Sequence, residues 1–362
     1  MELTTDYKKI ILENIPLIDV RAEVEYNKGA FPNTINLPIL TDEERHLIGI
    51  KYKAAGNESA TALGYEMVSG PIKEARVQAW ANFIKENPHA YLYCFRGGSR
   101  SRISQEWLHD IGIDLPRLDG GYKAFRTYLL DVLSGTWMNA NPITLGGHTG
   151  SGKTKVIYNV DKSIDLEGLA HHRGSSFGRY IDPQPQQIDF ENQMAYDMVK
   201  HDAKGYKHLV VEDESRNVGR CFINKDLFNY FRSGTMVVLD VTFEERIQNT
   251  LEEYVIESQK SHIKRFGETE GLQLWFDYIE GSMSRVKKRL GGDRFNDVFQ
   301  AFKNNYNTQQ ASGSYKAHEE WISMFLRDYY DPMYEYQMTN STRPISFQGD
   351  AQDVTDYLNA LD

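Results

Sequence analysis

The fold of the second half of the chain is decided by one stretch, Gly147-His148-Thr149-Gly150-Ser151-Gly152-Lys153-Thr154. It has the spacing G-x-x-x-x-G-K-[ST], and it lies between the strand-like run 143–145 and a helical segment. Glycines let backbone N–H groups turn inward around phosphate oxygens, and the lysine adds positive charge at the terminal phosphates. The stretch therefore predicts a loop that binds a di- or triphosphate, and a chance glycine-rich turn is the alternative.

Within this loop, Lys153 is the expected catalytic cation. The other residues that we expect to contact the phosphates are Gly147, Gly150, Ser151, Gly152 and Thr154. The Thr154 hydroxyl is also a candidate ligand for Mg²⁺, together with a carboxylate at the end of the strand-like run 208–212. Asp213 is the first choice for that carboxylate and Glu212 the second, and a solvated acidic loop is the alternative.

A second anion-binding loop is indicated earlier in the chain, at Cys94-Phe95-Arg96-Gly97-Gly98-Ser99-Arg100-Ser101. It joins the strand-like run 90–95 to a helix-like segment over 101–111. Successive N–H groups around a sulfur stabilise a thiolate or a bound oxyanion, and nearby arginines lower the pKa of a thiol. Such a sulfur can attack a chalcogen or a phosphorus atom.

In this loop, Cys94, Arg96 and Arg100 are the candidate catalytic residues, because guanidinium groups clamp phosphate-like oxygens in pairs. The loop residues expected to surround the bound anion are Phe95, Gly97, Gly98 and Ser99. The alternative is a buried structural cysteine, which remains the favoured interpretation for Cys221.

Composition narrows the class of protein. The chain has 362 residues, a formal net charge of −10 and 40% hydrophobic residues, which is typical of a globular protein. Two cysteines are too few for a disulfide scaffold, and no apolar run approaches the ~20 residues of a membrane span. The N-terminus lacks a secretory pattern, so we expect a cytoplasmic protein without membrane contact. A turn-rich stretch over 134–142 predicts two α/β domains, 1–136 and 137–362.

The segments around the cysteine loop resemble the rhodanese family over roughly residues 10–130. The resemblance rests on Leu17–Arg21, on Gly29–Pro38 and on Leu118–Tyr122, which is similar to the closing L-x-G-G motif. The usual rhodanese loop is C-x-x-x-x-R, and here one more residue separates Cys94 from Arg100. Rhodanese-fold dual-specificity phosphatases share the longer loop, which makes room for a tetrahedral phosphate.

The pairing of the two loops in one chain resembles the tRNA 2-selenouridine synthase family, and the stretches 166–178, 187–192 and 211–219 add to the resemblance. It implies a rhodanese-like α/β domain followed by a P-loop NTPase-like α/β domain with a helical C-terminal region. It also implies a transferase that acts on the wobble 2-thiouridine of tRNA. Geranyl diphosphate would bind the Gly147–Thr154 loop, and selenophosphate, supplied by another enzyme, would bind the Cys94 loop. Cys94 would then take selenium or orient it, and no tightly bound cofactor is expected besides Mg²⁺.

Further candidates are less specific. His171, His172, Arg173 and Ser175 are expected to line the second site, and a histidine metal site is a weaker alternative. For tRNA contact the sequence offers the basic stretch Arg285, Lys287, Lys288 and Arg289, with a solvated helix face as the alternative. The aromatic residues Tyr306, Trp321, Tyr329 and Tyr330 are candidates for base stacking, with core packing as the alternative.

Two other functions stay open on the residues alone. The longer cysteine loop also fits a rhodanese-fold phosphatase or sulfurtransferase fused to an ATP-binding kinase-like domain, although no general acid is evident. A nucleotide-regulated binding module, whose cysteine carries sulfur or senses redox state, is the other. The sequence makes no prediction of oligomeric state.

Overall fold

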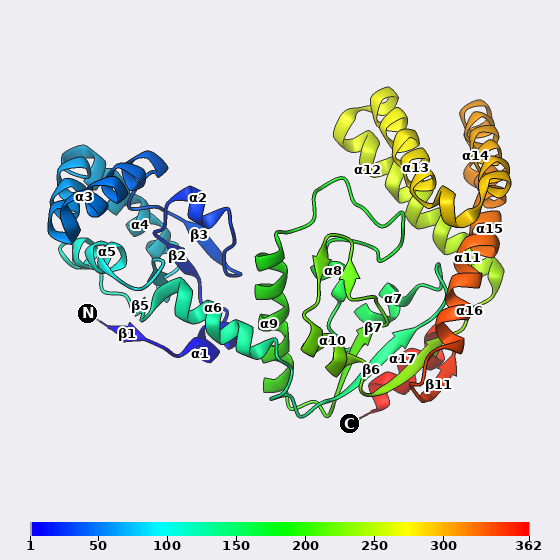
Figure 1. Ribbon diagram of the computed structural model, residues 1–362, viewed down its shortest axis with the longest axis horizontal. Coiled ribbons are helices and arrows are strands. Elements are labelled where there is room, and N and C mark those ends of the chain that lie inside the picture. Colours follow the sequence, from blue (N-terminus) through cyan, green and yellow to red (C-terminus); the bar gives the residue numbers. More distant parts are fainter. Residues whose placement is uncertain (1, 362) are drawn as a thin grey trace. The chain divides into compact units, whose positions relative to one another are not determined.

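The computed structural model describes residues 2–361, which form two compact units (Figure 1). The first unit contains the chain up to Trp137 together with Pro185–Gly205, and the second contains Met138–Gln184 and the chain from Tyr206 onward. The first change of unit lies one residue from the expected division after residue 136. Residues 185–205 also belong to the first unit, whereas the sequence analysis placed them in the second domain.

The first unit is built on a parallel five-stranded sheet of order β1-β5-β4-β2-β3. Its strands are β1 (Leu3–Thr4), β2 (Leu17–Asp19), β3 (Thr34–Asn36), β4 (Tyr91–Tyr93) and β5 (Arg117–Leu118). Its helices are α1 (Tyr7–Leu12), α2 (Glu23–Tyr26), α3 (Asp42–Met67), α4 (Gly70–Glu86), α5 (Ser99–His109), α6 (Gly121–Val132) and α9 (Gln187–Ala203). The central strands β2 and β4 are the two that the apolar runs predict, which confirms an α/β unit.

The long helix α3 begins with a capping box, in which Thr41 and Glu44 each accept a hydrogen bond from the other's backbone N–H. Gly56 has a φ of 77° and interrupts the helix, so α3 consists of two pieces that meet at an angle. Several of its apolar side chains are exposed, among them Leu47, Ile50 and Tyr65. This helix is therefore not packed over its whole length.

Helix α9 is fastened to the first unit by polar and apolar contacts. The Asp189 carboxylate accepts a hydrogen bond from the Ala30 N–H at 2.8 Å, and the Asn192 amide accepts one from Arg126 at 2.7 Å. The Phe190 and Tyr196 side chains of the helix are each only 1% exposed. The helix is thus part of the first unit's core, although it lies after the phosphate loop in the sequence.

The second unit has a parallel four-stranded sheet of order β11-β10-β6-β7. The strands are β6 (Asn141–Gly146), β7 (His208–Glu212), β10 (Thr235–Leu239) and β11 (Ile345–Gly349), and β8 (Asn217–Val218) pairs separately with β9 (Cys221–Phe222). Helices near the sheet are α7 (Lys153–Tyr158), α8 (Leu166–Leu169), α10 (Lys225–Phe231) and α17 (Ala351–Ala360). The predicted strand, loop and helix around Gly147–Thr154 are confirmed.

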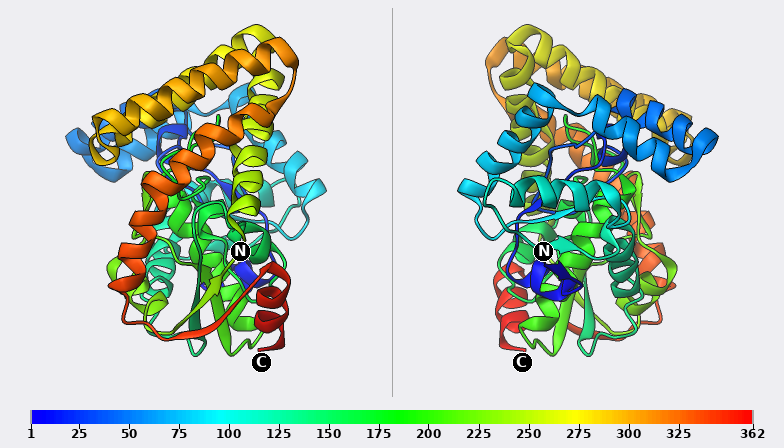
Figure 2. Two further views of the ribbon diagram at one scale, coloured as in Figure 1. Left: turned by 90° about the vertical axis from the view of Figure 1, so that its right-hand side faces the viewer. Right: turned by 90° about the vertical axis from the view of Figure 1, so that its left-hand side faces the viewer.

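A helical region extends from the second unit between β10 and β11. It comprises α11 (Phe243–Leu251), η1 (Glu252–Ile256), α12 (Glu257–Phe266), α13 (Glu268–Leu290), α14 (Gly292–Ser312), η2 (Tyr315–His318), α15 (Glu319–Phe325), η3 (Leu326–Tyr330) and α16 (Asp331–Thr339). The long helices α13 and α14 pack against each other (Figure 2). This is the helical C-terminal region that the sequence predicts.

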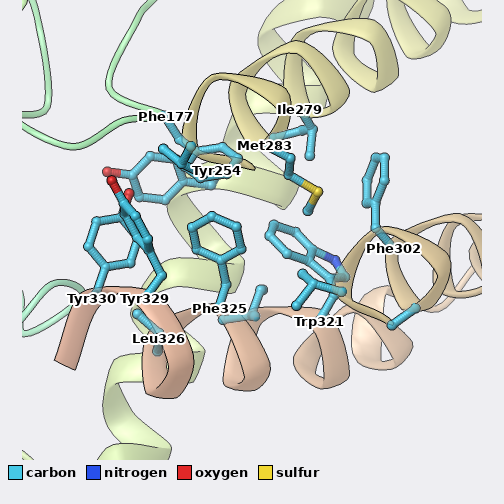
Figure 3. Packing of buried hydrophobic residues seen from close by; sticks show 14 of the residues in the cluster. Phe177, Tyr254, Ile279, Met283, Phe302, Trp321, Phe325, Leu326, Tyr329 and Tyr330 are labelled. Atoms are coloured by element: carbon cyan, nitrogen blue, oxygen red, sulfur yellow. The ribbon is translucent and has the colours of Figure 1, made fainter. Parts of the chain in front are cut away.

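The interior of this region is rich in aromatic side chains (Figure 3). Trp321 is 3% exposed, and Tyr329 and Tyr330 are each 6% exposed, while Tyr306 packs against the same cluster. The hypothesis that these rings stack on a splayed tRNA base is therefore wrong for the buried three, because their surfaces are already packed in the helical core.

Among residues 2–361, no helix is long and apolar enough to cross a membrane.

Candidate functional site

The first candidate site is the loop that joins β4 to α5. Cys94 follows the last residue of β4 and is only 3% exposed. Its thiol donates a hydrogen bond to the Ser101 hydroxyl, which lies 3.2 Å away and in turn donates to the Gly98 carbonyl at 3.2 Å. The Ser101 hydroxyl therefore holds the sulfur in place within the loop. The spacing alone gave Ser101 no separate role.

The wall behind the cysteine loop is the turn that begins α6. The Cys94 carbonyl accepts a hydrogen bond from the Tyr122 N–H, and the Phe95 carbonyl accepts one from the Lys123 N–H, both at 2.9 Å. A Cβ added to Gly121 would lie 2.3 Å from the Cys94 carbonyl oxygen. Gly121 is thus required by the close approach of two backbones, while Gly120 has a left-handed φ of 68°.

The two arginines of the loop have different surroundings. Arg100 forms a two-pronged ion pair with Glu25, whose carboxylate also accepts from Arg45 at 2.8 Å. Burial raises the pKa of Glu25, but the two guanidinium groups outweigh it and hold that pKa below its usual value. Arg96 is exposed and lies beside the Phe95 ring. Arg100 is therefore held at the loop by Glu25, a partner that the sequence did not identify, while Arg96 remains open to an incoming anion.

The second candidate site is the loop between β6 and α7. Lys153 donates to the Gly147 carbonyl at 3.0 Å and lies 3.5 Å from the His148 carbonyl. Helix α11 supports the loop from outside: Arg246 donates to the Thr149 carbonyl and Asn249 donates to the Gly150 carbonyl, both at 3.0 Å. The loop joins strand β6 to helix α7 as the sequence predicts, and the Lys153 amine contacts the loop's own carbonyl groups.

Two carboxyl groups adjoin this loop that the sequence analysis did not select. The Thr154 hydroxyl donates to Glu167 at 3.3 Å, and Glu214 interacts with both Glu167 and Lys153. Burial and the neighbouring Glu214 raise the pKa of Glu167. Glu167 lies in the stretch 166–178, but only the fold brings it to the phosphate loop.

The carboxylates chosen from the sequence are engaged elsewhere. Asp213 forms ion pairs with Arg343 at 2.8 Å and with Arg232 at 3.5 Å. Glu212 is 1% exposed and accepts the Leu166 N–H at 2.9 Å, and burial raises its pKa well above its usual value. The carboxylate in contact with Thr154 is thus Glu167, while Asp213 and Glu212 pair with groups from other segments. That Asp213 or Glu212 holds Mg²⁺ stays a prediction.

The stretch around His171 lies against the helical region. His171 stacks on Tyr180, Arg173 lies 3.9 Å over the same ring and pairs with Glu253, and Ser175 shares a hydrogen bond with Tyr254. His172 is 7% exposed, and burial together with nearby arginines lowers its pKa to about 4. Because His172 is neutral and Arg173 is paired with Glu253, these two residues contribute to the packing of the second unit and offer no unpaired positive charge to a ligand.

The basic stretch is exposed at the C-terminal end of α13. The side chains of Arg285, Lys287, Lys288 and Arg289 are all exposed. Arg285 donates to the Ser176 carbonyl at 3.0 Å, and the Lys287 amine lies 4.8 Å over the Phe295 ring. These residues therefore present positive charge at the surface. Among residues 2–361, no group of three or more histidine, cysteine or acidic residues is arranged to hold a metal ion.

Comparison with known proteins covers both units. Residues 4–128 match the family described as rhodanese-like domain, and residues 140–362 match the family described as tRNA 2-selenouridine synthase AAA domain. The tRNA 2-selenouridine synthase of Sulfurovum sp. (strain NBC37-1) is 47% identical over 98% of this chain and 97% of its own length. The tRNA 2-selenouridine synthase of Shewanella sediminis (strain HAW-EB3) is 44% identical over 98% of this chain and 96% of its own length. A crystal structure of the N-terminal domain of a putative ATP/GTP binding protein from Clostridium difficile 630 is 33% identical over 32% of this chain and 89% of that one, with a TM-score of 0.30.

Proposed function

Because the chain belongs to the tRNA 2-selenouridine synthase family, we propose that it converts 2-thiouridine of tRNA to 2-selenouridine in two transfers. The observation that carries the proposal is that both anion loops are formed within a chain that its relatives match over nearly its whole length. In the first transfer the 2-thio sulfur takes a geranyl group from geranyl diphosphate. In the second, selenium from selenophosphate replaces the S-geranyl group.

For the first transfer we assign the diphosphate to the Gly147–Thr154 loop. The thiouridine sulfur attacks the first carbon of the geranyl chain while the bond from that carbon to the diphosphate oxygen breaks. Negative charge grows on the leaving diphosphate, and inward-facing N–H groups and Lys153 stabilise it. The Lys153 amine, now hydrogen-bonded to the Gly147 carbonyl, would turn to the phosphate oxygens.

Magnesium fits this loop as a further source of positive charge. Mg²⁺ is commonly held by one or two carboxylates together with substrate phosphates. The Thr154 hydroxyl and the buried pair Glu167 and Glu214 supply such oxygens beside Lys153. When bound, the ion would neutralise part of the charge that collects on the diphosphate.

For the second transfer we assign selenophosphate to the cysteine loop. Selenium attacks C2 of the S-geranylated uracil, the C–S bond breaks with release of geranyl thiolate, and water then cleaves the Se–P bond to give phosphate and the selenouridine. Capture of selenium by Cys94 as a selenosulfide would need an oxidant, because selenium in selenophosphate is already reduced. We therefore give Cys94 and Ser101 the task of orienting selenium, and Arg96 and Arg100 that of holding the phosphate.

Separate assays of the two transfers test the assignment. The Cys94→Ala variant should retain S-geranylation of 2-thiouridine tRNA and lose most of its selenation, whereas Cys221→Ala, at the other buried cysteine, should retain both. Mass analysis of digested nucleosides distinguishes the products. Loss of both activities in a folded Cys94→Ala protein would refute the division of labour.

The phosphate loop has its own variant. Lys153→Ala should lower geranylation by at least about 100-fold, because a charge that acts on the leaving group is removed. Its selenation of an RNA that already carries S-geranyl-2-thiouridine should be unchanged. Normal geranylation by the folded Lys153→Ala protein would exclude the loop from that step.

A further inference from the structure

An apolar pocket of about 140 Å³ lies in the first unit, between α3 and α5. Its walls include Ile48, Ala60 and Gly64 from α3 and Ile103 and Trp107 from α5. The exposed lining is mostly apolar, and Tyr52 and Tyr65 at the pocket are 57% and 42% exposed. An open apolar cavity of this kind is suited to a hydrocarbon.

The pocket is continuous with the cysteine loop. Ser99 and Arg100, two residues of that loop, also line the pocket, and Ile103 lies one helical turn further along α5. Arg100 is fixed by its ion pair with Glu25, so the boundary between the anion loop and the apolar pocket is well defined. A molecule that reacts at the loop and carries a hydrocarbon chain finds apolar surface immediately beside it.

We propose that this pocket binds the geranyl chain of the S-geranylated uridine during selenium transfer. The inference rests on the proposed function and adds a location for the hydrocarbon of its intermediate. Binding the chain would bring the C–S bond to the selenium donor and hold the leaving group away from water. The pocket would thereby select S-geranyl-2-thiouridine over unmodified 2-thiouridine in the second transfer.

The volume agrees with a short isoprenoid. A protein cavity of about 150 Å³ lined by apolar side chains holds benzene, a molecule of six carbons. The pocket therefore encloses about one isoprene unit, and the remainder of a ten-carbon chain would lie along the exposed rings of Tyr52 and Tyr65. The cavity beside Thr149 of the phosphate loop is smaller, about 20 Å³, so the pocket between α3 and α5 offers more enclosed room.

The helix α3 offers a variant that fills the pocket and a matched control. A Cβ at Gly64 would meet Ile48 at 3.5 Å, an ordinary contact, so Gly64→Met should fold and place its side chain in the cavity. Gly49 lies in the same helix, would have nothing within 4 Å of an added Cβ and does not line the pocket. Gly49→Met is therefore the matched control, because it makes the same substitution in α3 and leaves the pocket empty.

The experiment measures selenation of anticodon stem-loop RNA that carries either S-geranyl- or S-methyl-2-thiouridine. Gly64→Met should raise KM for the S-geranyl substrate at least tenfold and for the S-methyl substrate, which does not reach the pocket, less than threefold, with geranylation unchanged. Gly49→Met should match the natural protein throughout. Equal KM values of Gly64→Met and the natural protein for the S-geranyl RNA, or equal losses on both RNAs, would overturn the proposal.

A binding measurement separates this inference from the proposed function. Trp107 lines the pocket, so its fluorescence should change when the nucleoside S-geranyl-2-thiouridine is added, and Gly64→Met should weaken that binding at least tenfold. If the natural protein binds the nucleoside in this way but does not selenate S-geranyl RNA, the proposed function fails and the pocket stands. If Gly64→Met leaves the binding unchanged, the pocket assignment is wrong whatever the activity.

Discussion

At the scale of single residues, the cysteine loop depends on how closely the Gly120–Gly121 turn approaches it. Gly121 has a φ of 57°, and its position is occupied on the side-chain face by the Cys94 carbonyl and the Gly97 N–H. A side chain here would have to displace the backbone that positions the sulfur. The sulfur's geometry is thus set by a residue 27 positions later in the sequence.

Gly121→Ala should therefore destabilise the protein by at least about 2 kcal/mol, since it adds both an unfavourable φ and an overlap with backbone atoms. Selenation should fall and geranylation should persist in the protein that remains folded. The control is Gly112→Ala, at a φ of 82° with nothing within 4 Å, which carries only the conformational cost of about 1 kcal/mol. Equal melting temperatures for the two variants would contradict the close packing described for Gly121.

Residues also show where sequence reasoning reaches its limit. Both loops could be located because their glycines, cations and flanking strands follow one another directly, and the spacing itself carries the physical requirement. Glu25, Glu167 and Glu214 could not be selected, because an acidic residue in a polar stretch has no local pattern that tells which cation the fold will bring to it. Asp213 stands at the expected strand end, but its ion pair with Arg343, 130 residues later, also has no local pattern in the sequence.

At the scale of elements, the basic end of α13 is exposed, and we expect it to contact phosphate groups of tRNA. Lys287→Glu combined with Lys288→Glu should weaken tRNA binding at least tenfold and reduce the slope of log affinity against log salt concentration by about 2, one for each lost contact. Filter binding at several salt concentrations measures both. The double variant Lys260→Glu with Lys264→Glu on α12 changes the net charge equally and should bind normally; an equal loss there would show that overall charge, not this end of α13, governs affinity.

The buried junction of η2, α14 and α15 makes the helical region sensitive to acid. The His318 side chain is fully buried, accepts a hydrogen bond from the Trp321 indole and contacts Gln309, and burial lowers its pKa to about 4. A folded-state pKa below the unfolded value of about 6.5 means that the unfolded chain binds the proton first. The stability due to neutral His318 is complete above about pH 7 and is lost as the pH falls toward 4.

Between pH 7 and pH 5 this histidine should remove about 2 kcal/mol of stability. His318→Gln should be less stable at pH 7 and should lose correspondingly less on acidification, as urea unfolding followed by tryptophan fluorescence at the two pH values can show. Parallel losses in the two proteins would mean that His318 does not account for the acid sensitivity.

At the scale of the whole molecule, the first unit is discontinuous. The rhodanese-like match ends at residue 128, but the unit also needs α9, which buries Phe190 and Tyr196 and hydrogen-bonds to Ala30. The sequence of α9 has no local pattern that distinguishes it from a helix of the second unit, so a domain boundary placed from the sequence puts it in the second unit. The fold class of each unit could be predicted from its own segments. The packing of α9 in the first unit could not.

A fragment of residues 2–137 should therefore be markedly less stable than the same fragment joined by a flexible linker to residues 185–205. The difference should be several kcal/mol, because the shorter fragment exposes the apolar surface of α1 and α6 that α9 covers. Thermal unfolding of the two fragments by circular dichroism makes the comparison. Identical melting curves would show that α9 contributes nothing to the first unit.

The return of α9 also orders events during synthesis. Domains usually fold as units from the N-terminus while the chain emerges from the ribosome. Here we expect the first unit to fold completely only after α9 has been synthesised, because α9 is part of its core. The phosphate loop and the stretch around His171 are synthesised before that helix. A single cut in the gene therefore cannot separate the two units without removing α9 from the first.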